Sequence, residues 1–356
     1  MQPKSVKILV VGPAWVGDMV MAQSLFITLK NTHPACQIDV LAPAWSLALM
    51  ARMPEVNEAI AMPFGHGQFN FFERVKLGQT LQAKAYDQTI LLPNSWKSAL
   101  IPFFAKIPVR TGYVGECRWG LLNDARRLDK TLLTMTVQRF VALGLSATAS
   151  LPTAYPPPKL SIQPEQQHAV IEKFQLSAFF TQDTDADADA DADAMTPKAN
   201  QPILALCPGA EYGEAKRWPV AYYADVAKQK RAEGWQVWLF GSEKDKATSA
   251  EINQQAGDVC VDFTGRTSLA EAVDLMSLVT AVVSNDSGLM HVAAALDKKL
   301  VALYGSSDPR FTPPLNDKAD ILSLNLACSP CFKRVCPLGH TACLTGLKPD
   351  AVLTVL

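Results

Sequence analysis

The chain has 356 residues, 49% of them hydrophobic and 19% charged, which is enough for about two domains with separate hydrophobic cores. Its formal charge is -1, but six aspartates lie in one Asp-Ala repeat at residues 183–194, and without them 33 basic residues face 28 acidic ones, a balance of +5. This small excess gives no reason to expect a nucleic-acid partner, and it fits an anionic substrate, an anionic membrane surface or an ordinary solvated surface.

The sequence does not predict a membrane-spanning protein. No apolar run reaches the ~20 residues that a helix needs to cross a bilayer. The first residues lead into a strand pattern and not into the apolar core of a signal peptide. We therefore expect a cytoplasmic location.

Short apolar runs alternate with stretches of helical length in both halves of the chain. In the first half the predicted strands are Ile8–Val11, Ile38–Leu41, Ala59–Met62, Gln88–Leu92 and Val109–Gly112. In the second half they are Ile203–Cys207, Gln236–Phe240, Cys260–Phe263, Ala281–Ser284 and Leu300–Tyr304, with helices at Val220–Glu233 and Ser268–Ser277. This alternation predicts an α/β fold with two Rossmann-like domains facing across a cleft. Periplasmic-type binding proteins and some epimerases share the pattern, so it does not select a function.

The boundary between the halves is marked by composition. A triple proline at 156–158 and the Asp-Ala repeat separate them, and the repeat cannot bury apolar surface. We predict an N-terminal domain at 1–165, a linker at 166–200 in which the Asp-Ala repeat is disordered, a C-terminal domain at 201–325 and a Cys-rich tail at 326–356. Asp-x-Asp pairs can hold a metal ion when a strand fixes them, but this repeat has no flanking strand, so we predict no metal there.

The first predicted strand is followed by a glycine loop with an unusual charge. Gly12 and Gly17 have the spacing of a phosphate-binding loop, but Asp18 stands where such a loop has lysine and would repel phosphate. At the carboxyl end of the first strand, Asp18 faces the region where open α/β sheets bind ligands, so it is a candidate general base. Alternatively it only caps the following helix and complements its dipole, which is worth about 0.5–2 kcal/mol.

A second loop follows the strand at Ile203–Cys207 and has the composition of a diphosphate clamp. The backbone N–H groups of Gly209 and Ala210 can approach an anion, and Lys216 and Arg217 can neutralise a leaving phosphate without a metal. A helix is predicted to begin near Pro219. The alternative is a solvated basic loop.

A third polar turn follows the strand at Ala281–Ser284 and opens a helix rich in small residues. The N–H groups of Ser287 and Gly288 would point at a phosphate on the helix N-terminus, with Asp286 holding hydroxyls of the ligand and His291 on the first turn. Asp286 can equally be only an N-cap, and His291 a helix histidine packed under the sheet edge. Glu243, after the strand at Gln236–Phe240, is placed to accept hydrogen bonds from two ribose hydroxyls, or is a surface carboxylate.

Taken together, these motifs resemble those of the bacterial lipopolysaccharide heptosyltransferases, glycosyltransferase family 9. The resemblance covers nearly the whole chain except the Asp-Ala repeat and the tail after about residue 325. The segments that carry it are Gly12–Met19, Pro54–Asn57, Leu92–Ser95, Gly120–Asp124, Cys207–Glu211, Lys216–Pro219 and Asn285–Ala295.

The resemblance implies a GT-B enzyme that inverts the anomeric centre and needs neither a metal ion nor another cofactor. It would move heptose from ADP-L-glycero-β-D-manno-heptose to heptosyl-Kdo2-lipid A. Asp18 would be the catalytic base and Lys216 would bind the phosphate. The residues of the ADP-heptose site would be Glu243, Asp286, Ser287, Gly288 and His291, to which the loop pattern adds Gly209, Ala210 and Arg217.

The acceptor of such an enzyme is polyanionic, and the first half carries a basic series with aromatic neighbours. We predict acceptor contacts from Gly17, Asn94, Lys97, Arg110 and Arg118. A basic, partly apolar face would also make peripheral contact with the inner leaflet of the inner membrane. The alternative is ordinary amphipathic packing with solvated charges.

Four of the eight cysteines fall within sixteen residues of the tail, at Cys328, Cys331, Cys336 and Cys343. The spacing permits a structural zinc site, although the segment between the second and third cysteines is short for two separate knuckles. The alternatives are a redox-sensitive or substrate-covering loop of free thiols and, given the reducing compartment, less readily disulfides. Residues 348–356 predict the start of a helix.

Two other functions remain compatible with the sequence. One is a family member that uses the same sugar nucleotide with a different core acceptor. The other is a non-catalytic sugar-nucleotide-binding protein in which Asp18 is only a helix cap. A nicotinamide enzyme is disfavoured because no G-x-G-x-x-G follows either candidate strand.

Overall fold

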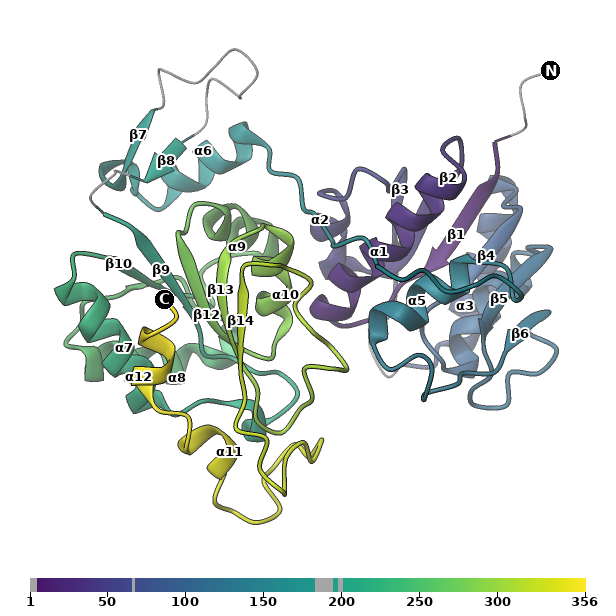
Figure 1. Ribbon diagram of the computed structural model, residues 1–356. Coiled ribbons are helices and arrows are strands. Elements are labelled where there is room, and N and C mark those ends of the chain that lie inside the picture. Colours follow the sequence, from purple (N-terminus) through teal and green to yellow (C-terminus); the bar gives the residue numbers. More distant parts are fainter. Residues whose placement is uncertain (1–4, 66–67, 183–194, 198–200) are drawn as a thin grey trace. The chain divides into compact units, whose positions relative to one another are not determined.

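The computed structural model describes residues 5–65, 68–182, 195–197 and 201–356. The chain divides into two compact units, unit 1 from Met1 to Lys159 and unit 2 from Leu160 to Leu356 (Figure 1). Each unit is built around a six-stranded sheet in which every described pairing is parallel. The prediction of two Rossmann-like α/β domains is confirmed, and the cleft between them stays a prediction.

Unit 1 alternates strands with helices along its length. Its strands are β1 (Lys7–Val11), β2 (Gln37–Pro43), β3 (Glu58–Met62), β4 (Gln88–Leu91), β5 (Val109–Tyr113) and β6 (Asp124–Arg126). Its α-helices are α1 (Val16–Thr32), α2 (Leu47–Met50), α3 (Phe71–Leu81), α4 (Leu100–Phe104) and α5 (Thr136–Gly144). Short 3-10 turns lie at η1 (Ala44–Ser46), η2 (Gln82–Lys84) and η3 (Trp96–Ala99).

Unit 2 has the same alternation with additional elements at both ends. Its strands are β7 (Phe180–Gln182), β8 (Met195–Pro197), β9 (Ile203–Cys207), β10 (Gln236–Leu239), β11 (Val261–Asp262), β12 (Ala281–Asn285), β13 (Lys299–Leu303) and β14 (Ala319–Leu322). Its α-helices are α6 (Pro164–Lys173), α7 (Val220–Ala232), α8 (Lys246–Ala256), α9 (Leu269–Ser277), α10 (Gly288–Ala295), α11 (Ala342–Thr345) and α12 (Pro349–Leu353). The 3-10 turns are η4 (Ser177–Phe179), η5 (Glu214–Lys216) and η6 (Glu243–Asp245).

The two large sheets have the same strand order. It is β3-β2-β1-β4-β5-β6 in unit 1 and β11-β10-β9-β12-β13-β14 in unit 2, the doubly wound order of Rossmann-like sheets. The order reverses between β1 and β4 and between β9 and β12. Ligands bind such sheets beyond the carboxyl ends of the strands at this switch point, so each unit has one place where a site is expected.

The central strands are buried along their whole length. All five residues of β9 and of β12 are buried, because helices cover both faces of a doubly wound sheet. The sequences of such strands are continuous apolar runs. For this reason their predicted bounds agree with the observed ones within a residue or two. The edge strands β6 and β14 are partly exposed and carry aspartate, so the apolar pattern missed them.

The boundary between the units differs from the predicted one. It lies after Lys159, while the sequence placed it after residue 165, and α6 packs on α9 within unit 2 (Figure 1). Part of the predicted linker at 166–200 is therefore ordered structure of unit 2. The prediction that residues 183–194 are disordered falls outside the described residues.

The tail belongs to unit 2. Leu344, Leu347 and Val352 are buried in its core, and α12 packs against α7 (Figure 1). The helix predicted near the end of the sequence is α12. Its first residue is Pro349, a position where the missing N–H of proline costs nothing.

Candidate functional site

The switch point of unit 2 brings together the two loops that the sequence singled out. The loop at 208–218 follows β9, and residues 286–287 link β12, which ends at Asn285, to α10. The two strands are direct neighbours, with Ser284 in register with Cys207. The candidate diphosphate loop and the candidate phosphate-binding helix therefore meet at one edge of the sheet.

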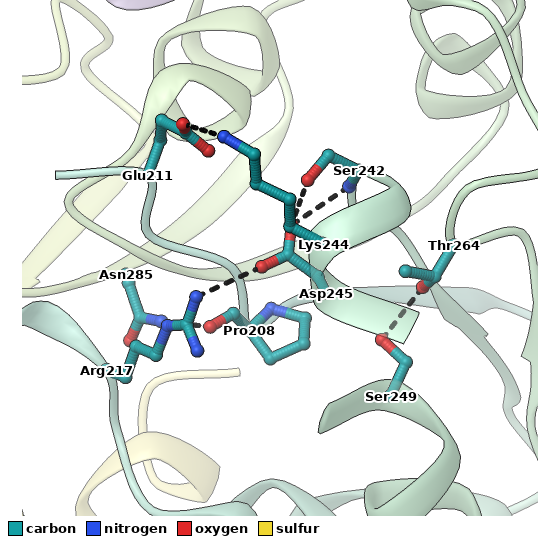
Figure 2. Close-up of polar contacts among 9 residues, drawn as sticks. All are labelled: Pro208, Glu211, Arg217, Ser242, Lys244, Asp245, Ser249, Thr264 and Asn285. Carbon is teal, nitrogen blue, oxygen red and sulfur yellow. Dashed lines mark hydrogen bonds and ion pairs between the residues drawn. The ribbon is translucent and has the colours of Figure 1, made fainter. Parts of the chain in front are cut away.

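Asn285 ties these two loops together. It is fully buried, its side-chain amide donates to the carbonyl of Pro208 (2.7 Å), and its Oδ1 accepts the N–H of Trp218 (3.1 Å). Figure 2 shows the amide directed at Pro208. One side chain thus fixes both ends of the 208–218 loop. The sequence analysis included Asn285 in a motif but assigned it no role.

Lys216 and Asp286 form an ion pair at this edge. The Lys216 Nζ lies 2.5 Å from the Asp286 Oδ2, with the lysine side chain 18% exposed and the aspartate side chain 5% exposed. Lys216 ends the turn η5 and also lies over the ring of Tyr212, 5.2 Å from its centroid. The pair joins the two loops and holds a cation, shielded from most of the solvent, where a leaving phosphate is expected.

The carboxylate of Asp245, to which the sequence analysis assigned no role, is the centre of a second set of polar contacts. Its Oδ2 accepts the N–H (2.9 Å) and the hydroxyl (2.7 Å) of Ser242, and its Oδ1 lies 3.5 Å from the Arg217 Nη2 (Figure 2). A Cβ at Gly209 would lie 2.7 Å from the Asp245 Oδ2, so only glycine fits there without displacing the carboxylate. The detectable signal was the Ser242-x-x-Asp245 capping box.

The N-terminus of α10 presents Ser287 as its N-cap, with Gly288 as the first helical residue. The Ser287 side chain makes no capping hydrogen bond, and its Oγ lies 3.2 Å from the Oγ of Ser284. Burial lowers the pKa of His291 to about 4, while Asp286 raises it and Lys216 lowers it. His291 is therefore neutral at pH 7 and is buried below the site.

Glu243 and the loop around it are more open. Glu243 begins η6 after β10, is mostly exposed, and pairs with Lys246 at 2.8 Å. Beside it, Lys244 pairs with Glu211 across the 208–218 loop (Figure 2). Both pairs can exchange readily with a ligand, because exposed ion pairs contribute little stability.

Asp18 lies at the switch point of unit 1. The helix α1 has Trp15 as its N-cap, so Asp18 occupies the first turn and is not the cap itself. A Cβ at Gly12 would lie 2.7 Å from the Met19 Cε, so glycine allows the loop to pack closely on α1. Gly17 is buried within the same turn, and Asn94 follows β4, the neighbouring strand, with its side chain exposed. Asp18, Gly17 and Asn94 therefore share one sheet edge.

The other predicted acceptor contacts differ in exposure. Lys97 is partly exposed, and Arg110 donates to the carbonyls of Leu121 (2.7 Å) and Ile107 (2.6 Å). Arg118 was predicted to bind the acceptor, but its side chain is only 1% exposed.

The guanidinium of Arg118 is used within unit 1. It donates to the carbonyls of Tyr113 (2.6 Å) and Pro93 (2.7 Å) and to the Asn94 Oδ1 (3.4 Å). Burial lowers its pKa to about 10. The structure thus places Arg118 beneath the loop that carries Asn94, where it orders that loop and does not face solvent.

Within the described residues, no group of three or more His, Cys, Asp or Glu side chains is arranged to hold a metal ion. The Asp-x-Asp repeat lies outside those residues. Among the helices that the structure describes, none combines the length and apolarity needed to cross a membrane.

Three comparisons relate the chain to known proteins. The family model described as glycosyltransferase family 9 (heptosyltransferase) matches residues 74–342. Lipopolysaccharide heptosyltransferase 2 of Salmonella typhimurium is 47% identical over 98% of this chain and 97% of its own length, and the Escherichia coli K12 protein of that name is 46% identical over the same shares. The solved structure of E. coli ADP-heptose lps heptosyltransferase II aligns with a TM-score of 0.81 at 42% identity, covering 98% of this chain and 97% of that one.

Proposed function

Because this chain belongs to glycosyltransferase family 9, the heptosyltransferases, we propose that it transfers heptose from ADP-L-glycero-β-D-manno-heptose to heptosyl-Kdo2-lipid A. The chain is a heptosyltransferase of lipopolysaccharide core assembly, and the proposal concerns the acceptor, the stereochemistry and the independence from metal. The transfer is proposed to invert the anomeric centre without a metal ion.

The observation that carries the proposal is the position of Lys216. Departure of ADP leaves new negative charge on the diphosphate, and a glycosyltransferase must stabilise that charge with a metal ion or with protein cations and N–H groups. Lys216 is held at 2.5 Å from Asp286 at the switch point, beside the N-terminus of α10. A diphosphate bound there would accept hydrogen bonds from the ammonium of Lys216 and from the N–H groups of Ser287 and Gly288 at the start of the helix.

Asp18 is proposed as the general base. It lies in the first turn of α1 at the carboxyl edge of the unit 1 sheet, where an acceptor hydroxyl can reach it. The carboxylate takes the proton as the acceptor oxygen bonds to the anomeric carbon and the bond from that carbon to the ADP oxygen breaks. One displacement of this kind inverts the configuration. Gly17 and Asn94 are proposed to contact the acceptor at the same edge.

The neutral state of His291 supports its role in positioning the sugar donor. A charged imidazole below the site would repel Lys216, and burial excludes that charge at pH 7. A neutral His291 leaves Lys216 as the main cation beside Asp286. Glu243, whose carboxylate is mostly exposed, is proposed to accept hydrogen bonds from the ribose hydroxyls once Lys246 exchanges.

A membrane-facing surface is proposed on unit 1, with the protein in the cytoplasm. Phe72 is 83% exposed, and Phe69 and Trp96 are exposed with ring centroids 5.1 Å apart. Lys106 and Arg110 line a surface hollow together with Phe103 and Phe104. Exposed aromatic rings beside cations suit an anionic bilayer surface. Retention of the protein by anionic vesicles in sedimentation tests this contact, and equal retention by neutral vesicles would contradict it.

The test of the function is ADP release by the purified full chain without added metal and with EDTA present. ADP-heptose is supplied with either Kdo2-lipid A or heptosyl-Kdo2-lipid A. We expect release only with the heptosylated acceptor. Release with Kdo2-lipid A alone would instead assign the first transfer, and dependence on added Mg²⁺ or Mn²⁺ would contradict the metal-free mechanism.

The role of Asp18 is tested with Asp18→Asn. We expect kcat to fall by roughly 10²–10⁴-fold, because the asparagine side chain cannot accept the proton of the acceptor hydroxyl in the transition state. Asp225→Asn, which changes an exposed carboxylate on α7, is the matched control and should keep full activity. If Asp18→Asn kept wild-type turnover, Asp18 would be only a residue of the first helical turn.

A further inference from the structure

We propose that the tail binds one zinc ion through the thiolates of Cys328, Cys331, Cys336 and Cys343. The ion would be structural and would take no part in the transfer step. Its predicted effect on ADP-heptose binding rests on the proposed function, but the metal site itself does not.

The four cysteines lie around one small pocket of unit 2. It is also lined by Ala215, Ser306 and His340, together with Pro337, Leu338 and Thr341. All four are free thiols. The sequence left a zinc site open, because the segment between the second and third cysteines is short for two separate knuckles, and the fold brings all four cysteines to the lining of one pocket. Four thiolates are a common ligand set for structural zinc.

Ser306 supplies independent evidence for a ligand in this pocket. Its side chain is 1% exposed, and its Oγ has no hydrogen-bond partner within the described part of the chain. The carbonyl of the same residue accepts the N–H groups of Cys331 (3.1 Å) and Phe332 (2.7 Å). A buried hydroxyl without a partner is costly, and the sulfur of a metal-bound thiolate beside it would accept a hydrogen bond from it.

His340 is the other possible ligand, and its hydrogen bond argues against it. The His340 Nδ1 accepts the N–H of Ala342 at 2.9 Å. In a neutral imidazole the remaining nitrogen then carries the proton and has no lone pair for a metal. The donor set is therefore the four cysteines.

The site would stabilise the loop that holds Lys216. Between the second and third cysteines, the carbonyl of Arg334 accepts the N–H of Ala215 (3.0 Å), and the carbonyl of Phe332 accepts the hydroxyl of Tyr212 (2.9 Å). Because Phe332 and Arg334 lie between Cys331 and Cys336, holding these two thiolates in place would also hold the two carbonyls that accept hydrogen bonds from the 208–218 loop.

The thiols are not already in coordination geometry. In the residues that the structure describes, no group of three or more His, Cys, Asp or Glu side chains is arranged to hold a metal ion. Binding must turn the side chains inward as they lose their protons. Such coupling between deprotonation, local rearrangement and metal affinity is usual for thiolate sites.

The experiment measures zinc in the full chain, purified under reducing conditions without chelator or polyhistidine tag, by elemental mass spectrometry. We expect about one zinc per chain, released when a mercurial reagent titrates the thiols. Cys336→Ser should lose most of this zinc. Cys117→Ser, which changes an exposed cysteine of unit 1, is the matched control and should retain it.

The proposal is overturned if the wild-type protein retains no zinc after incubation with an equimolar amount and gel filtration. It is also overturned if Cys117→Ser and Cys336→Ser lose zinc to the same extent. Since the wild-type metal content needs no variant and no substrate, this result is independent of whether a variant folds and of the proposed function. If the loop argument also holds, Cys336→Ser should weaken ADP binding several-fold.

Discussion

Substitutions in the ion pair between Lys216 and Asp286 are predicted to affect the stability of the protein and its activity differently. Lys216→Met removes the cation and leaves the carboxylate of Asp286, 5% exposed, without its partner. Breaking a fully buried pair costs about 3–5 kcal/mol, and the partial exposure of Lys216 reduces this to about 2–3 kcal/mol. For a unit of this size we expect a fall in Tm of about 5–10 °C.

The second variant tests where that loss comes from. Asp286→Asn alone should cost less, about 1 kcal/mol, because Lys216 can turn toward solvent. The double variant should recover most of the stability lost by Lys216→Met, since no unpaired carboxylate remains. Lys228→Met, a change on the exposed side of α7, is the control for loss of a lysine.

Activity should not recover with stability. If Lys216 stabilises the leaving diphosphate, kcat should fall by roughly 10²–10³-fold in Lys216→Met and stay low in the double variant. Thermal unfolding and ADP release measure the two effects on the same preparations. Recovery of both stability and turnover in the double variant would refute the reasoning, because Lys216 would then act only by pairing with Asp286.

Two further predictions concern the same unit. Gly209→Ala should force the Asp245 carboxylate to move, because the new Cβ would lie 2.7 Å from its Oδ2. We expect the free energy of unfolding, measured in urea, to fall by about 1–3 kcal/mol and ADP to bind more weakly. Gly65→Ala is the control and should show neither effect, because within the described residues the nearest atom to its new Cβ, apart from its chain neighbours, lies 3.7 Å away. Burial lowers the pKa of His291 from 6.5 to about 4. Between these two pH values the unfolded chain binds a proton at this histidine and the folded protein does not. The free energy of unfolding should therefore fall by on the order of 3 kcal/mol from pH 6.5 to pH 4. His291→Asn should flatten that slope, while His33→Asn, at an exposed histidine, should not.

The controls define what would contradict these two predictions. Equal effects of Gly209→Ala and Gly65→Ala would mean that the contact with Asp245 is not what excludes a side chain. An unchanged pH slope in His291→Asn would mean that another group titrates over this range.

The parts of the fold that the sequence predicted well share one physical property. Strands such as β9 are buried on both faces, so their sequences are unbroken apolar runs, and Pro208 marks the end of β9. The loops after β9 and β12 were identified because glycine, lysine and a helix start follow buried strands. Their meeting at one edge follows from the doubly wound order, which the alternation of elements predicts.

The residues that the sequence misjudged depend on long-range contacts. Arg118 belongs to a basic series, and only the fold reveals that its guanidinium is surrounded by the carbonyls of Pro93, Ser95 and Tyr113, which come from two segments of the chain. Asp245 looked like a helix-start carboxylate next to the more noticeable Glu243. Its contact with Arg217 joins residues 28 positions apart, which no local pattern reports.

The buried polar residues explain how the site can work without rearranging during the reaction. Electrostatic stabilisation of a leaving group is effective only if the charges are held in place beforehand, since reorienting them would consume the energy they supply. Asn285 fixes the two ends of the 208–218 loop, and Asp245 holds Arg217 and leaves room only for glycine at 209. The residues proposed to touch ADP-heptose are thus positioned by neighbours that do not touch it. Substituting Asn285 should therefore reduce turnover even though its side chain is fully buried.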